Sequence, residues 1–172
     1  MNPRKRQNEA LSHLSKSGAA RMVDVGGKQV TLRSACAEAL ISLGPRASAC
    51  LSQRGSAPKG NVLETARLAG IMAAKRTWEL IPLCHPLNLD SVQVEAEMRE
   101  NHIRFEVRVK TEGKTGVEME ALTAAAVAAL TAYDMVKSLD KATEIGPVRL
   151  LEKSGGKSGA WRRDVNHAAG NR

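Results

Sequence analysis

Hydrophobic residues recur at every second position in two neighbouring stretches of the chain, 92–98 and 103–109, with a turn at 100–101 between them. A period of two places successive side chains on opposite faces of a strand, so this pattern predicts a β-hairpin with one apolar face. On its polar face, acidic residues of the first strand can lie opposite basic residues of the second strand.

Three segments earlier in the chain have the spacing of helices. Thr31 is a candidate N-cap for a helix that ends at Gly44, and a second, short helix is expected over 47–53. Asn61 is the candidate N-cap of a strong helix over 62–77.

The remaining pattern adds a long helix and two short strands. Thr115 and Glu118 match a capping box, which predicts an alanine-rich helix from this point to about Leu139. Strands are expected over 22–25 and 148–151. The combination predicts an α+β domain in which helices pack on one face of an antiparallel sheet.

Both ends of the chain are polar and lack hydrophobic periodicity. We therefore expect a flexible N-terminal arm over 1–20, a single domain over 21–158, and a flexible C-terminal tail over 159–172. A chain of 172 residues is long enough for one domain with a hydrophobic core.

A formal net charge of +8 indicates a polyanionic partner, which could be a nucleic acid, a phosphorylated metabolite or a membrane surface. The chain has only two Trp, one Tyr and one Phe, which are too few for a surface that stacks bases. No apolar run reaches the roughly 20 residues that span a bilayer. These observations favour a small phosphorylated ligand over nucleic acid or membrane.

The three cysteines are an odd number without a CxxC pair, which argues against a disulfide framework. The basic start of the chain is not followed by the apolar segment of a secretory signal. Both observations predict a cytoplasmic protein.

Cys84 and His85 lie between Pro82 and Pro86, so a stiff turn holds the imidazole. A metal site needs three or four ligands, and the other histidines lie elsewhere in the chain, so no metal site is expected. His85 is interpreted either as a structural histidine or as an anion-binding or acid–base group.

Asp134 and Lys137 are three residues apart and lie on one face of the long helix. They form either a surface salt bridge or, because the helix is apolar and mostly buried, a proton-transfer pair. Glu120 either complements the helix dipole or has a function of its own. Glu120 and Asp134 are about 21 Å apart along the helix axis, so if both ends are functional the site is either long or shared between subunits. We favour the shared site, which predicts an obligate oligomer.

Several strings of the sequence, taken together, closely resemble the MoaC family of cyclic pyranopterin monophosphate synthases. The resemblance covers about residues 21–159, and two long strings, Ile81-Pro82-Leu83-Cys84-His85-Pro86-Leu87 and Thr115-Gly116-Val117-Glu118-Met119-Glu120-Ala121-Leu122-Thr123, carry most of it. It implies a ferredoxin-like α+β fold and a homohexamer, a trimer of dimers, with active sites at subunit interfaces.

The resemblance also implies a reaction. Family members convert 3′,8-cyclo-7,8-dihydro-GTP, the product of a radical S-adenosylmethionine GTP cyclase, into cyclic pyranopterin monophosphate and release pyrophosphate. No cofactor is firmly implied; Mg²⁺ bound through the substrate triphosphate stays open as an alternative.

Residue by residue, the resemblance makes Asp134, Lys137 and Lys59 candidates for proton transfer. Lys59 lies in a short match, in which Asn61 stands where the family often has Asp. The candidates for substrate binding are Leu83, Cys84, His85, Met119, Glu120, Lys75, Arg33, Lys28 and Lys153. Two other classes, a basic nucleic-acid-binding module and a nucleotide-binding scaffold without activity, compete with this enzyme.

Overall fold

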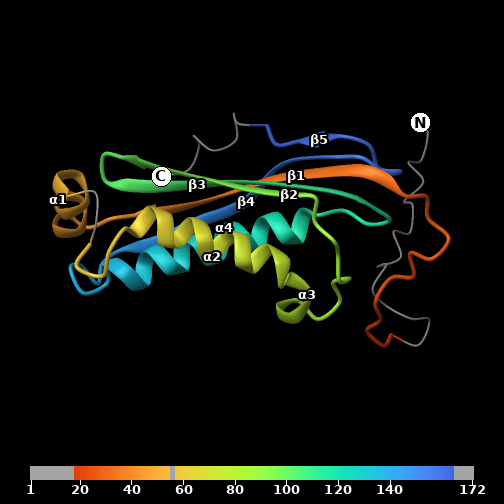
Figure 1. Ribbon diagram of the computed structural model, residues 1–172, viewed down its shortest axis with the longest axis horizontal. Helices are drawn as coiled ribbons and strands as arrows, with labels where there is room; N and C mark the ends of the chain where they lie inside the picture. The colour runs from red at the N-terminus through yellow and green to blue at the C-terminus, as the bar shows by residue number, and fades with distance from the viewer. Residues whose placement is uncertain (1–17, 55–56, 165–172) are drawn as a thin grey trace, which may run out of the picture.

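The computed structural model describes residues 18–54 and 57–164; residues 1–17 of the predicted arm and 165–172 of the predicted tail lie outside this range. Within it, five strands form an antiparallel sheet in the order β2-β3-β1-β4-β5 (Figure 1). The strands are β1 (Thr31–Ser42), β2 (Ser91–Arg99), β3 (His102–Gly113), β4 (Glu144–Ser154) and β5 (Trp161–Arg162).

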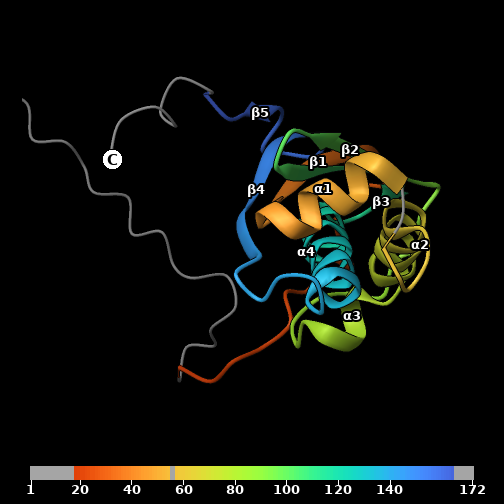
Figure 2. The same ribbon diagram turned by 90° about the vertical axis from the view of Figure 1, so that its left-hand side faces the viewer.

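The two longest helices pack against one face of this sheet and against each other (Figure 2). The helices are α1 (Pro45–Arg54), α2 (Val62–Lys75), α3 (Thr77–Leu80) and α4 (Glu118–Val136). The predicted α+β class, an antiparallel sheet with helices on one face, is therefore confirmed. The finer assignment to the ferredoxin-like fold stays a prediction.

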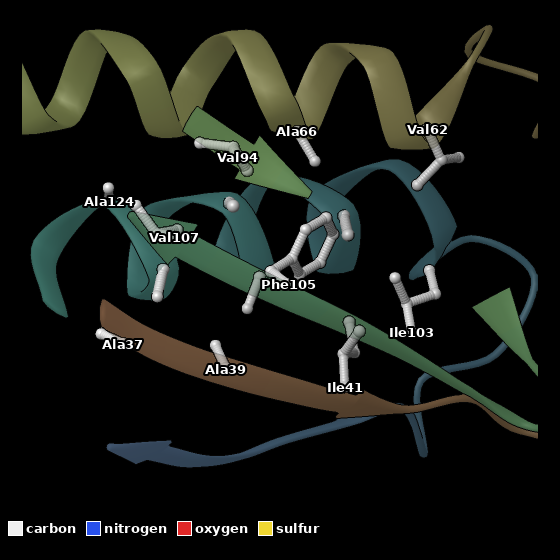
Figure 3. Packing of buried hydrophobic residues seen from close by; sticks show 14 of the residues in the cluster. Ala37, Ala39, Ile41, Val62, Ala66, Val94, Ile103, Phe105, Val107 and Ala124 are labelled. Atoms are coloured by element: carbon white, nitrogen blue, oxygen red, sulfur yellow. The ribbon is translucent and has the colours of Figure 1, made fainter. Parts of the chain in front are cut away.

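The core lies between the sheet and these two helices (Figure 3). Phe105 is fully buried at its centre, and Ile103 and Val107 extend the same apolar row along β3. On α2, a side chain at Gly70 would come within 3.1 Å of the carbonyl oxygen of Ala124 on α4. Small residues therefore let the two helices lie close together.

The residues of β1 form a strand, so the helix predicted from Thr31 to Gly44 is wrong. Alanine is the strongest helix former, which is why the alanine-rich composition favoured a helix. In the structure β1 pairs with β3 on one side and β4 on the other. Its buried side chains Ala37 and Ala39 are small, which suits a central strand against which α4 packs.

Two smaller predictions also fail. Residues 22–25 form no strand and belong to an irregular segment. Thr115 does not cap α4: the N-cap is Val117, without a side-chain cap bond, and the Glu118 carboxylate pairs with Lys153.

The other predicted elements are present, with shifted ends. Asn61 caps α2 as expected, because its side-chain oxygen accepts a hydrogen bond from the Glu64 amide at 3.1 Å. The hairpin of β2 and β3 has the predicted position, α1 spans the short helix, and α4 ends at Val136 rather than near Leu139. β5 pairs with β4 and lies within the range assigned to the tail. The predicted domain boundaries stay a prediction.

The helix-free face of the sheet carries a network of ion pairs. Glu38 is only 4% exposed, and its carboxylate accepts hydrogen bonds from Arg104 and Arg149, each at 2.7 Å. Arg104 also pairs with Glu106, which in turn pairs with Arg108. The ion pairs of this network join β1, β3 and β4, not β2 to β3 as predicted, and within the hairpin Glu95 lies opposite a second acid, Glu106.

Among the described residues, α4 is the one helix long and apolar enough to cross a membrane. Its alanines, from Ala121 to Ala132, are largely buried against the sheet and α2. The hydrophobicity of α4 is therefore explained by its place in the core.

Candidate active site

A cavity of about 620 Å³ is lined in part by residues of the first turn of α4. Four stretches that are far apart in sequence supply its wall, within 23–33, 81–87, 115–120 and 153–158. Eight of the nine residues predicted to bind substrate line it: Lys28, Arg33, Leu83, Cys84, His85, Met119, Glu120 and Lys153. The ninth, Lys75, is exposed in the last turn of α2 and does not line the cavity.

Arg33 is fixed in the cavity wall by main-chain carbonyl groups. Its Nε donates to the carbonyl oxygen of Gly113 at 2.9 Å, and its terminal nitrogen donates to that of Lys114 at 3.2 Å. Because a guanidinium has five N–H groups, donors are left over for an anion. The side chain therefore combines a fixed position with free hydrogen-bonding capacity.

The turn after β4 packs tightly against Arg33. Gly155 has a φ of +95°, and a side chain there would come within 2.3 Å of the carbonyl oxygen of Leu32. At Gly156, with a φ of +67°, a side chain would overlap the Arg33 guanidinium, 2.2 Å from its nitrogen. Only glycine fits both positions, and such a turn can present main-chain N–H groups to a phosphate.

Two further basic residues are also held in place. The Lys153 ammonium pairs with Glu118 at 3.2 Å and donates to the hydroxyl of Ser158 at 3.1 Å. His85 donates through Nε2 to the carbonyl oxygen of Val23 at 2.8 Å. The irregular segment that was predicted to be a strand thus anchors the imidazole.

The cavity wall also contains a buried acidic residue, Glu120. Glu120 is 4% exposed, and burial raises the pKa of its carboxyl from 4.5 to about 7, with a further contribution from the nearby charge of Glu118. Burial, followed by the charge of Glu120, also raises the pKa of the Cys84 thiol. Glu120 can therefore exchange a proton near neutral pH, whereas Cys84 is a poor nucleophile.

The three predicted catalytic residues form a second cluster. Asp134 pairs with Lys137 at 2.7 Å and with Lys59 at 3.1 Å, and the Lys59 ammonium also donates to the main-chain carbonyl of Asp134 at 2.9 Å. The turn between Ala57 and Gly60, closed by two main-chain hydrogen bonds, carries Lys59 to this position. Lys59, which is far from Asp134 and Lys137 in the sequence, is therefore next to them in the structure.

This cluster is exposed, so the expected buried setting for Asp134 and Lys137 is wrong. Their side chains are 57% and 51% exposed: Asp134 lies in the last turn of α4, and Lys137 is its C-cap. Hydrogen bonds and charge from Lys137 and then Lys59 lower the pKa of Asp134, and Asp134 raises that of Lys137. The cluster thus consists of one carboxylate paired with two lysine side chains.

The cavity and the cluster lie at opposite ends of α4. Glu120 is in its first turn and Asp134 in its last, about 21 Å apart along a helix axis. Within one described chain, the predicted binding residues and the predicted catalytic residues therefore do not meet.

The cavity wall also holds residues that were not among the predicted binding residues, and four of them with polar groups or close packing are Thr115, Gly116, Glu118 and Ser158. Glu118 was interpreted as a capping residue, which concealed its pairing with Lys153. A signal was available, because Thr115, Gly116 and Glu118 all lie in one of the two long strings that carry the family resemblance.

Fold and cavity together define an α+β protein with a basic, glycine-bordered cavity and a buried acid in its wall. A family model described as the MoaC family matches residues 22–156, which include all twelve predicted site residues. The chain therefore belongs to the MoaC family, the enzyme family of cyclic pyranopterin monophosphate synthase. This membership confirms the resemblance and gives the chain a role in molybdenum cofactor biosynthesis.

Proposed function

We propose that the protein is a cyclic pyranopterin monophosphate synthase, which converts 3′,8-cyclo-7,8-dihydro-GTP into cyclic pyranopterin monophosphate and pyrophosphate. The observation that carries the proposal is the pair of clusters at the two ends of α4. One is a cavity with three cations and a buried acid, and the other is a carboxylate between two lysines.

The cavity offers complementary surfaces for the two parts of such a substrate. Arg33, Lys28 and Lys153 can bind the triphosphate, together with the main-chain amides of the glycine turn. Glu120 can accept hydrogen bonds from the N–H groups of the guanine-derived ring, with Met119 beside it. Any Mg²⁺ would enter with the triphosphate.

The second cluster supplies proton transfer and positive charge. When a substrate hydroxyl attacks the α-phosphorus, a P–O bond forms, the bond to the β-phosphate breaks, and pyrophosphate leaves with the electron pair. Lys59 and Lys137 stabilise the negative charge that develops, and a lysine that has lost its proton can act as base. Asp134 keeps both ammonium groups in place.

A second copy of the chain brings the two clusters together, with the cavity of one subunit facing the lysine cluster of its neighbour. Apolar side chains exposed on the helices provide surface for such an interface: Leu68, Met72, Trp78, Leu80 and Leu130. We propose a homohexamer, a trimer of dimers, in the cytoplasm, supplied with substrate by a radical S-adenosylmethionine GTP cyclase.

The proposed reaction is tested by incubating the purified protein with 3′,8-cyclo-7,8-dihydro-GTP and measuring pyrophosphate and the cyclic pyranopterin together. Both products should form in equal amounts. Tight binding of the substrate by a folded oligomer without either product would instead indicate a scaffold.

The shared site is tested by co-expressing two inactive variants, Asp134→Asn and Glu120→Gln. In an oligomer of one variant alone, every site lacks either Asp134 or Glu120. In a mixed oligomer, some sites combine Glu120 from an Asp134→Asn chain with Asp134 from a Glu120→Gln chain and are therefore complete. Random assembly should restore about a quarter of the wild-type activity. No recovery in oligomers shown to contain both chains would contradict a site shared between subunits.

A further inference from the structure

Glu118 and Lys153 form an ion pair inside the cavity wall. The Glu118 Oε1 atom lies 3.2 Å from the Lys153 ammonium, and the two side chains are only 28% and 27% exposed. Glu118 begins α4, whereas Lys153 is near the end of β4. The pair therefore fixes a cation of the sheet to the helix that carries Glu120.

Gly116 makes room for this arrangement. A side chain at Gly116 would lie 1.8 Å from Glu118 Oε2 and 2.7 Å from its carboxyl carbon. The Glu118 side chain thus folds back over the main chain at Gly116 and occupies the volume of the missing side chain. Any larger residue at this position would displace the carboxylate from Lys153.

Lys153 needs such support more than Arg33 does. Arg33 is a planar group held by two main-chain carbonyls, whereas a lysine ammonium lies at the end of a flexible four-carbon stem. Holding that stem in one rotamer before substrate arrives removes part of the entropy that binding would otherwise lose. Among residues 18–54 and 57–164, the groups that hold the Lys153 ammonium are the Glu118 carboxylate and the Ser158 hydroxyl.

We propose that Glu118 is a positioning residue, seated over Gly116, that holds the Lys153 ammonium ready for a phosphate group of the substrate. This inference rests on the proposed function, because it assigns the cavity to a phosphorylated substrate. It assigns to Glu118 a role that is separate from helix capping.

The charge of Glu118 has a second, measurable effect, since it contributes to the raised pKa of Glu120. The other ionisable groups that face this cavity are Lys28, Arg33, Cys84, His85 and Lys153. Removing the negative charge of Glu118 should therefore move the Glu120 inflection of the pH–rate profile to lower pH.

The test compares Glu118→Gln, Glu118→Ala, Gly116→Ala and the double variant Gly116→Ala/Glu118→Ala with the wild-type oligomer. We expect kcat/KM to fall about 10- to 100-fold in Glu118→Ala, and less in Glu118→Gln, which keeps a hydrogen-bond acceptor. In Gly116→Ala, kcat/KM should fall by a similar factor with little loss of thermal stability, because only the end of the flexible Glu118 side chain has to move. The kcat/KM of the double variant should be no lower than that of Glu118→Ala, since both substitutions remove the same contact between Glu118 and Lys153.

Glu64→Gln is the matched control, because Glu64 is also an ion-paired acid in the first turn of a helix. It should leave kcat/KM and the pH profile unchanged. Wild-type values in Glu118→Ala and Gly116→Ala would overturn the positioning role.

A binding measurement separates this inference from the proposed reaction. Calorimetric titration with inorganic pyrophosphate requires no turnover. Loss of a negative charge alone would strengthen pyrophosphate binding in Glu118→Ala, whereas loss of positioning should weaken it about 10-fold. A wild-type protein that forms no product would refute the proposed reaction, and stronger pyrophosphate binding by the variant would refute the role of Glu118.

Discussion

Asp134 holds the ammonium group of Lys59 with two of its oxygen atoms, one in the side chain and one in the main chain. The carbonyl oxygen belongs to the last turn of α4, where main-chain acceptors lack partners within the helix. A lysine from a separate turn therefore satisfies the end of the helix and joins the carboxylate in the same contact. Structural and chemical roles of Asp134 can be separated by changing the side chain alone.

In Asp134→Asn, the main-chain contact to Lys59 remains, but the negative charge between the lysines is lost. Turnover should fall at least about 100-fold, with the oligomer intact. Product formation and size-exclusion chromatography check both statements. Near-normal turnover would remove Asp134 from the proposed mechanism.

Glu120 should make stability depend on pH. Its pKa is about 7 in the folded protein and 4.5 ordinarily, so between these values the folded state binds more protons than the unfolded state. The free energy of unfolding should therefore fall as the pH rises from about 4.5 to about 7, by about 3 kcal/mol in total. In Glu120→Gln, the free energy of unfolding measured by urea denaturation should not show this decrease. A variant with the same pH dependence as the wild type would contradict the assignment to Glu120.

Gly155→Ala should destabilise the turn after β4 more than Gly159→Ala does. Both residues have positive φ, but only at Gly155 would the added carbon overlap main-chain atoms, at 2.3 Å from the Leu32 carbonyl oxygen. We expect a loss of about 1 kcal/mol for Gly159→Ala and at least about 2 kcal/mol more for Gly155→Ala. Thermal denaturation of the two variants side by side makes the comparison, and equal losses would be inconsistent with the tight packing.

Glu38→Gln should destabilise the sheet, because it leaves Arg104 and Arg149 without the buried carboxylate that they share. The loss should be about 2–4 kcal/mol. Glu95→Gln is the control, since Glu95 is exposed on β2 and should change stability by less than about 0.5 kcal/mol. Chemical denaturation of both variants tests the difference.

The fold could be predicted where the sequence period and the burial pattern agree. The hairpin of β2 and β3 has one polar face and one buried apolar face, as its alternating sequence predicts. Asn61 caps α2 through a hydrogen bond to a residue three positions away. β1 could not be recognised, because its alanines favour a helix locally and only the pairing with β3 and β4 makes it a strand. Tertiary contacts there override the local preference.

The same limit applies to the candidate site. Residue types and the family strings indicated the binding set and the lysine cluster, and the 14-residue separation along the helix already predicted two distant half-sites. Which residues hold Lys153 could not be deduced, because Glu118 is as suitable for a capping box as for an ion pair. Lys75, assigned by resemblance, lies outside the cavity of the single chain, and its role stays a prediction.

The continuous helix α4 fixes both the distance and the relative direction of Glu120 and Asp134, which limits how the length of this segment can change in evolution. A loop can gain or lose a residue and adjust locally, but one residue inserted into α4 would turn Asp134 by about 100° around the axis and move it by about 1.5 Å. Seven inserted residues would nearly restore its direction, yet place it about 10 Å farther away. Insertions and deletions should therefore be tolerated in the connecting loops and rejected within α4, although most of its length touches neither half of the site.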